Sequence, residues 1–247
     1  MSMSKARAEK RPLPKRFYST VSIAASEQGW RILLDGRPVK TPARKPLAAP
    51  CEPLAEAIGA EWAAQEKQID PFTMPLTRLA HLAIDRMGEV RAPAAAEIAR
   101  YARTDLLCYR AEEGELAALQ ATAWDPWLDW AASALDAPLN RAETLLPIEQ
   151  PEASIAALET RALALDDWRL TGLASAVPLL GSAVLGFALL EGEGTGLAIF
   201  EASRVDERYQ AGRWGEDAEA AEAAENRKRD LLACEVLFRT LDEARVG

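Results

Sequence analysis

The chain has a single histidine, His81, so any histidine-based chemistry must use this residue. Asp85 follows it by four positions, and a helix would place both side chains on one face. One histidine and one aspartate supply too few ligands for a zinc site. A Ser-His-Asp triad lacks support, because the chain has no Gly-x-Ser-x-Gly turn. We therefore expect His81 to be a core or surface residue and expect no metal.

Paired acidic residues are the second candidate for chemistry. Two carboxylates that are buried together can act as general acid and base. Neighbouring acids on a helix usually point apart into solvent, so a hydrolase that uses such pairs is kept only as the alternative function. The pairs are Asp166/Asp167, Asp206/Glu207 and Glu216/Asp217.

A glycine-rich stretch at Gly192, Gly194 and Gly196 precedes an expected helix. Its spacing matches neither the Walker pattern nor the dinucleotide-binding pattern. Glu191 and Glu193 beside it would repel phosphate. We interpret the stretch as a turn and expect no cofactor.

Tryptophans recur every third residue at Trp124, Trp127 and Trp130. Core packing is the favoured interpretation, because tryptophan is usually mostly buried. The alternative is a platform for a protein partner, since tryptophan is frequent in binding hot spots. Trp214, together with Asp206 and Glu207, forms a second group of aromatic and acidic residues that could contact a basic, apolar partner.

The elements that position these residues begin with a small antiparallel sheet. Residues 17–24 alternate and include β-branched side chains, which predicts a strand. Residues 30–34 predict a second strand, and residues 37–40 can return as a third after the Asp35-Gly36 turn.

Helical patterns dominate the remainder of the chain. Pro53 suits a first helical turn, and Leu54, Ile58 and Trp62 then share one face. Residues 76–87 predict a helix, and Pro93 is expected to open another that runs towards residue 107. Asp125-Pro126 is a typical helix start. The last helix, about 216–244, carries one apolar stripe. The stripe consists of Leu231, Cys234, Phe238 and Leu241.

The segment 170–190 has no charged residue and is long enough to span a bilayer. Pro178 stands in its middle, and several of its residues are small. We expect a buried helix that is broken near Pro178, with no membrane insertion.

The amino-acid composition indicates which broad class of protein this is. The chain has 247 residues, 49% hydrophobic and 27% charged, with a net charge of −9. Such a composition is typical of a soluble globular protein, and an acidic surface disfavours nucleic acid as a partner. The three cysteines, Cys51, Cys108 and Cys234, have no metal or disulfide spacing, so reduced thiols are expected.

These patterns predict an α+β fold, in which a small N-terminal domain of antiparallel sheet and helix precedes a larger all-helical domain. We expect a flexible basic arm over residues 1–14, the small domain over 15–73 and the helical domain over 74–247. The arm has no apolar signal region, which favours a bacterial cytoplasmic protein, or the mitochondrial matrix if the source is eukaryotic.

Six short sequence motifs occur in one order along the chain. They are Gly29-Trp30 with residues 34–42, Glu61-Trp62 with Gln65, residues 74–79, residues 104–110, Trp124-Asp125-Pro126, and Asp206-Glu207 with Gln210 and Trp214-Gly215. Together these strings resemble one family, the assembly chaperones for the α subunit of the ATP synthase catalytic head. The resemblance extends from about Lys15 to the final helix.

This resemblance implies a chaperone, not an enzyme, that holds the free α subunit until the β subunit replaces it. It implies a role for an acidic residue of the C-terminal helical part, which matches Glu207, with Asp206 beside it. Arg78 and Arg110 also match the strings, with structural roles equally open. We expect a monomer whose partner-binding residues are Glu207, Asp206, Trp214, Trp124 and Trp127.

Overall fold

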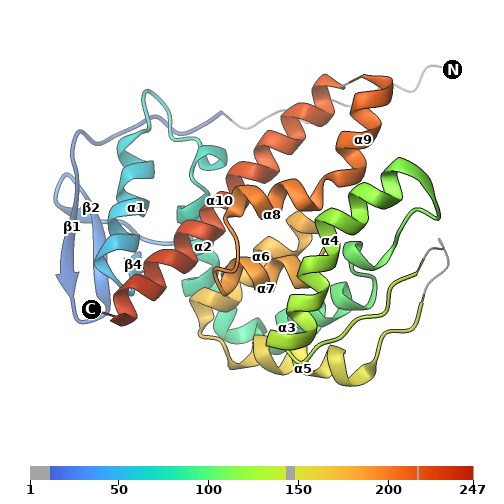
Figure 1. Cartoon of the computed structure of the whole chain (residues 1–247). Helices are drawn as coiled ribbons and strands as arrows, with labels where there is room; N and C mark the ends of the chain where they lie inside the picture. The colour runs from blue at the N-terminus through green and yellow to red at the C-terminus, as the bar shows by residue number, and fades with distance from the viewer. Residues whose placement is uncertain (1–11, 143–147, 216, 247) are drawn as a thin grey trace, which may run out of the picture.

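The computed structural model describes residues 12–142, 148–215 and 217–246. A small sheet with one helix lies at one end of the molecule, and a set of helices forms the other end (Figure 1). This arrangement confirms the predicted α+β class. The expected boundary between residues 73 and 74 lies between the short helix η1 (Pro71–Thr73) and α2 (Pro75–Leu82).

The sheet is antiparallel in its order β1-β2-β3, and β4 also pairs with β2. Its strands are β1 (Val21–Ser26), β2 (Gly29–Leu34), β3 (Arg37–Pro38) and β4 (Ala48–Ala49). The first strand begins later than predicted, because the Asp35 carboxylate accepts the backbone N–H groups of Ser19 and Thr20 at 3.0 and 2.8 Å. The predicted Asp35-Gly36 turn is confirmed, with φ angles of 47° and 75°.

Helix α1 (Glu52–Ala63) packs against β1 and β2. Pro53 lies in its first turn as predicted, and Leu54 and Ile58 point into the core. Gly59 faces Val21 and Ile23, and a Cβ added there would make only ordinary van der Waals contact with their side chains.

The helical part contains the remaining elements. After α2 come η2 (Ala83–Met87), α3 (Gly88–Arg103), η3 (Leu106–Cys108), α4 (Gly114–Ala134), α5 (Glu152–Ala164), α6 (Asp167–Leu180), α7 (Ala183–Leu190), α8 (Gly196–Ser203), α9 (Val205–Trp214) and α10 (Ala218–Val246).

Of the two proline predictions, the one for Pro126 was wrong, because this residue lies inside α4 instead of opening a helix. Within the bounds of α3 the backbone is non-helical at Val90, with φ −118° and ψ 17°, and the helix resumes after it. Pro93 lies in the first turn of this second helix, in agreement with the prediction. In α4 the buried face of Trp124 and Leu128 continues past Pro126, and this packing outweighs one missing hydrogen bond.

The uncharged segment 170–190 lies in α6 and α7, where every residue of α7 and seven of the 14 residues of α6 are buried. Pro178 stays within α6, and the break comes at Gly181, where φ is 66°, followed by the cap Ser182. Among the described residues, no helix is both long and apolar enough to cross a membrane.

Helix α10 runs diagonally across the molecule and joins its two ends (Figure 1). It packs against α1 near the sheet and against α2, α6 and α8 in the helical part. The predicted apolar stripe is confirmed, since Leu231, Cys234, Phe238 and Leu241 are all buried. The division into two separate domains stays a prediction, because α10 belongs to the packing of both parts.

All three cysteines are buried and unpaired in the structure, in agreement with the expected reduced thiols. Most of the expected flexible arm, residues 1–11, lies outside the described residues. Its end at Pro14 follows the body of the protein, where Ile69 N–H donates to the Pro14 carbonyl oxygen at 2.8 Å.

Candidate functional site

Helices α9 and α10 form a hairpin that projects from the helical part (Figure 1). Gly215 connects them with a φ of 91°, a conformation that favours glycine. Helix α9 contains no buried residue, although its central residues are partly covered. A helix with no buried residue contributes little to the core. Helix α9 therefore presents most of its surface to solvent, and it carries Asp206, Glu207 and Trp214, three of the predicted partner-binding residues.

Glu207 holds the hairpin together. Its carboxylate accepts hydrogen bonds from Arg204 Nε at 2.8 Å and from Arg227 Nη2 of α10 at 2.9 Å. Partial burial raises the pKa of Glu207, but the hydrogen bonds and charges of the two arginines outweigh it, so the pKa is lowered overall. Glu207 therefore stays ionised at neutral pH, and its side chain remains 44% exposed.

Asp206 has a different role from its neighbour. Its carboxylate accepts a hydrogen bond from Gln120 Nε2 at 2.7 Å, and Gln120 Oε1 accepts the N–H of Ala111 at 2.8 Å. Gln120 is buried in α4. Asp206 thus anchors the start of α9 to the body, while Glu207 faces the hairpin.

Trp214 is the most exposed large apolar side chain of the described residues, at 77%. It lines a cavity of about 550 Å³ between α9 and the start of α10, together with Glu207, Ala211 and Arg227. The structure therefore brings Glu207 and Trp214 to one surface. We refer to this surface, formed by Glu207, Ala211, Trp214 and Arg227, as the hairpin groove.

The other tryptophans divide between core and surface. Trp124 is fully buried, its Nε1 donates to the Ala202 carbonyl oxygen at 2.7 Å, and the Arg110 guanidinium lies 5.1 Å from its ring centre. A direct partner contact at Trp124 is thus inconsistent with this structure. Trp127 and Trp130 are partly buried against the core.

Trp127 lines a second, more apolar cavity of about 550 Å³ between α4, α8 and α9. Leu119 and Tyr209 form other parts of its wall, and Leu119 is 45% exposed. The sequence interpretation missed both residues. The spacing of Leu119, Ala123 and Trp127, four residues apart on one helical face, was the signal that pointed to this groove.

The described acidic residues considered for chemistry have structural partners. Asp85 accepts from Thr41 Oγ1 at 2.6 Å, Asp166 caps α6, and Asp167 pairs with Arg91. Burial lowers the pKa of His81, which keeps the ring neutral at physiological pH. Within residues 12–142, 148–215 and 217–246, no cluster of three His, Cys, Asp or Glu side chains could hold a metal ion.

The two motif arginines also have internal partners. Arg78 forms an ion pair with Asp230 of α10 at 2.6 Å, and Arg110 pairs with Asp125 at 2.8 Å. The Arg110 side chain is only 8% exposed. Arg78 connects α2 to α10, which is distant in sequence, and Arg110 connects the segment after η3 to α4, which favours structural roles for both.

Residues 15–132 match the model of a family described as ATP12 chaperone protein. The crystal structure of Atp12 from Paracoccus denitrificans is 40% identical, with a TM-score of 0.85, and the alignment covers 92% of this chain and 98% of that chain. A structure of an Asp-to-Lys variant of the P. denitrificans protein gives a TM-score of 0.84 at the same identity, over 92% of this chain and 97% of that one.

The mitochondrial protein atp12 of Schizosaccharomyces pombe is 25% identical over 250 residues, which cover 94% of this chain and 86% of that protein. Together these similarities place the chain in the ATP12 chaperone family. Membership confirms the function that the resemblance implied, a chaperone for assembly of the ATP synthase α subunit. A chaperone family implies no catalytic activity, which confirms the non-enzymatic prediction.

Proposed function

We propose that this chaperone binds the unassembled α subunit of the ATP synthase catalytic head through the hairpin groove and the neighbouring Trp127 cavity. It holds the α subunit in an assembly-competent form until the β subunit replaces it. The observation that carries this proposal is the joint placement of Glu207 and the exposed Trp214 on one surface of an ATP12-family fold.

An unassembled subunit needs a partner that covers its exposed interface. A subunit of a ring exposes apolar surface until its neighbours arrive, and such surface aggregates. The Trp127 cavity offers apolar walls and the hairpin groove offers a charged rim, so the two surfaces could cover an interface of mixed character. A partly polar interface of moderate size also permits release.

Both grooves use α9 as a wall, on opposite faces of the helix, so a client that contacts both wraps around α9. Tyr209 faces the Trp127 cavity, whereas Glu207 and Trp214 face the hairpin groove. Trp127 and Trp214 are the proposed aromatic contacts, and Glu207 the proposed charged one. Asp206 acts on this surface indirectly by fixing α9 to α4, and Trp124 by fixing α4 to α8.

The protein acts as a monomer in the cytoplasm of a bacterial cell, without nucleotide or metal. Family members occur both in bacteria, such as P. denitrificans, and in mitochondria, such as the S. pombe protein. Light scattering after gel filtration should give a mass near 26.9 kDa. A stable dimer, or a protein that sediments with membranes after a carbonate wash, would refute this part of the proposal.

The test is capture of separately expressed α and β subunits by the tagged chaperone, without nucleotide. Selective capture of the free α subunit is expected. The variant Trp214→Ala should lose capture, and the matched control Trp168→Ala, a partly buried tryptophan of α6, should retain it if it stays folded. Equal capture by wild type and Trp214→Ala would remove the hairpin groove from the proposal.

A further inference from the structure

A third cavity lies on the small sheet domain, away from α9 and α10. Its volume is about 540 Å³, and one wall is the β2–β3 hairpin from Leu34 to Lys40. The aromatic side chains of Phe17, Tyr18 and Trp62 form the opposite wall. The hairpin segment is also one of the strings that carry the family resemblance, and the proposed function assigns it no role.

The walls of this cavity are held in place by specific hydrogen bonds. The Asp35 carboxylate binds the backbone N–H of Ser19 and Thr20, which draws the segment of Phe17 and Tyr18 onto the hairpin. The Tyr18 hydroxyl donates to the Trp62 carbonyl oxygen at 2.7 Å. The cavity is therefore preorganised, and a ligand would lose little free energy in ordering it.

Its chemistry combines apolar surface with unpaired positive charge. Phe17 is 74% exposed at the edge of the cavity. Arg37 and Lys40 are exposed, and neither side chain makes an ion pair or hydrogen bond to another described residue. The one acidic group, Asp35, is already engaged by the backbone.

The charge of the whole chain is also unevenly distributed. Residues 15–73 contain 8 Lys and Arg against 7 Asp and Glu, whereas residues 74–247 contain 17 against 30. The small domain is thus nearly neutral, and the helical part carries most of the negative charge. An acidic segment of a partner would be repelled by the helical part and less so by this end, where Arg37 and Lys40 offer positive charge.

The donors that a ligand can reach are the two cations. The indole Nε1 of Trp62 has no hydrogen-bond partner among the described residues, but it is buried, so Trp62 offers the cavity its ring. Arg37 and Lys40 are exposed and supply the hydrogen-bond donors, which favours a ligand that brings acceptors.

We propose that this cavity binds an extended peptide segment of the client polypeptide, one that carries a carboxylate next to an apolar side chain. The carboxylate lies between Arg37 and Lys40, and the apolar side chain packs against Phe17 and Trp62. This inference rests on the proposed chaperone function, and it gives the chaperone a second contact with its client.

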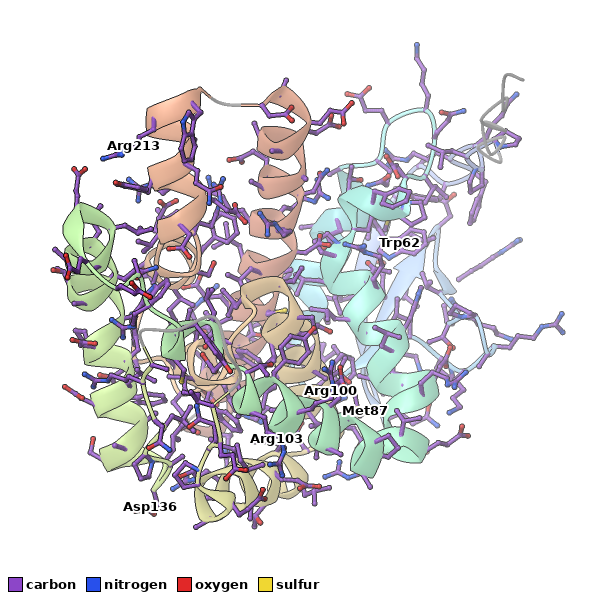
Figure 2. All side chains as sticks on the ribbon, turned by 90° about the vertical axis from the view of Figure 1, so that its right-hand side faces the viewer. Trp62, Met87, Arg100, Arg103, Asp136 and Arg213 are labelled. Atoms are coloured by element: carbon purple, nitrogen blue, oxygen red, sulfur yellow. The ribbon has the colours of Figure 1, made fainter. Side chains whose placement is uncertain are left out.

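The two contacts are well separated. Figure 2 shows Trp62 and Arg213, a residue of α9, on opposite sides of the molecule. A client held at both sites is bound more tightly than at either alone, and release from one site leaves it tethered at the other.

The first experiment uses defined probes and does not need the client. A peptide of alternating Glu and Leu is titrated into isotope-labelled protein, and NMR follows the seven indole N–H signals, with Trp62→Phe to assign that of Trp62. The Trp62 signal should shift with the Glu-Leu peptide but not with a Lys-Leu peptide or with ATP. A shift with ATP alone, or no shift at Trp62, overturns the inference.

The second experiment uses the α subunit and matched charge reversals. Arg37→Glu with Lys40→Glu should weaken capture of the α subunit about tenfold and abolish the peptide shift. The control is Arg44→Glu with Lys67→Glu, which reverses two exposed charges that do not line the cavity. Unchanged capture by the first variant refutes the second contact.

The outcomes separate this inference from the proposed function. If the Arg37→Glu, Lys40→Glu variant captures the α subunit as well as the wild type does, the cavity is refuted as a client site. The chaperone proposal stays intact in that case. If the wild type fails to capture the α subunit, the chaperone proposal is refuted. The cavity then cannot bind a segment of this client, even if the Glu-Leu peptide binds there.

Discussion

Glu207 of α9 and Arg227 of α10 lie twenty residues apart in sequence and are joined at 2.9 Å. With Arg204 on the other side, the carboxylate neutralises one of two guanidinium groups that would otherwise repel each other across the hairpin. The geometry of the hairpin groove, and with it the position of Trp214, therefore depends on a single acidic side chain.

Glu207→Lys should open the hairpin groove. The new ammonium group lies beside Arg204 and Arg227, so α9 and the start of α10 move apart and α-subunit binding falls at least about tenfold. The loss in unfolding free energy should be small, about 1 kcal/mol or less, since the pair is partly exposed. Binding assays and thermal unfolding measure the two effects.

The matched control for this charge reversal is Glu56→Lys on α1, an exposed residue without an ion pair in the described chain. It should leave binding unchanged. If Glu207→Lys folds and binds the α subunit like the wild type, the acidic residue has no role in client recognition.

Trp124→Ala and Trp214→Ala should separate stability from binding. Truncation of the fully buried Trp124 leaves a large cavity and removes the bond to the Ala202 carbonyl oxygen, so the unfolding free energy should fall by about 3–5 kcal/mol. Trp214 is exposed, and its truncation should change stability by less than about 0.5 kcal/mol.

Chemical denaturation and α-subunit capture, measured on both variants, test this contrast. Trp214→Ala should reduce capture without a change in denaturation midpoint, as expected of a hot spot. A large destabilisation by Trp214→Ala would mean that its ring packs against the body of the protein in solution.

Several features could be predicted from the sequence because they are local. The Asp35-Gly36 turn depends on two adjacent residues, and the stripe from Leu231 to Leu241 depends on helical spacing alone. The Asp206/Glu207 pair could be identified by motif, but the separate roles of its members could not. Gln120, the partner of Asp206, is 86 positions away, and only the packed structure reveals it.

Pro126 shows why local rules failed elsewhere. A proline at this position is typical of a helix start, but α4 continues because Trp124 and Leu128 bury one uninterrupted face. Trp124 and Trp127 are likewise two tryptophans only three positions apart on the same helix, yet one is fully buried and the other is partly exposed. Their different burial depends on where α8 and α9 pack, which spacing does not specify.

Asp105 should give the stability of the protein a specific pH dependence. Complete burial raises the pKa of this carboxyl from 3.8 to about 6, against the hydrogen bonds from Ser182 and the N–H groups of Leu107 and Val184. The folded state then binds a proton more tightly than the unfolded state. Its contribution to stability is full below about pH 4 and falls as the pH rises to about 6.

The variant Asp105→Asn removes this titration. The unfolding free energy of wild type minus that of the variant should decrease by about 3 kcal/mol from about pH 3 to pH 7, since the pKa shift from 3.8 to about 6 spans about two units of about 1.4 kcal/mol each. Urea denaturation at several pH values measures it. A difference that is constant with pH would show that Asp105 ionises normally in the folded protein.

The most direct test of the chaperone account is displacement. Tagged chaperone is loaded with purified α subunit, washed, and then mixed with increasing β subunit without nucleotide. The account predicts that the α subunit leaves the chaperone as β is added and appears in α–β complexes, with little α bound by Glu207→Lys at the start. Retention of α on the chaperone at saturating β, or aggregation of the released α, would contradict it.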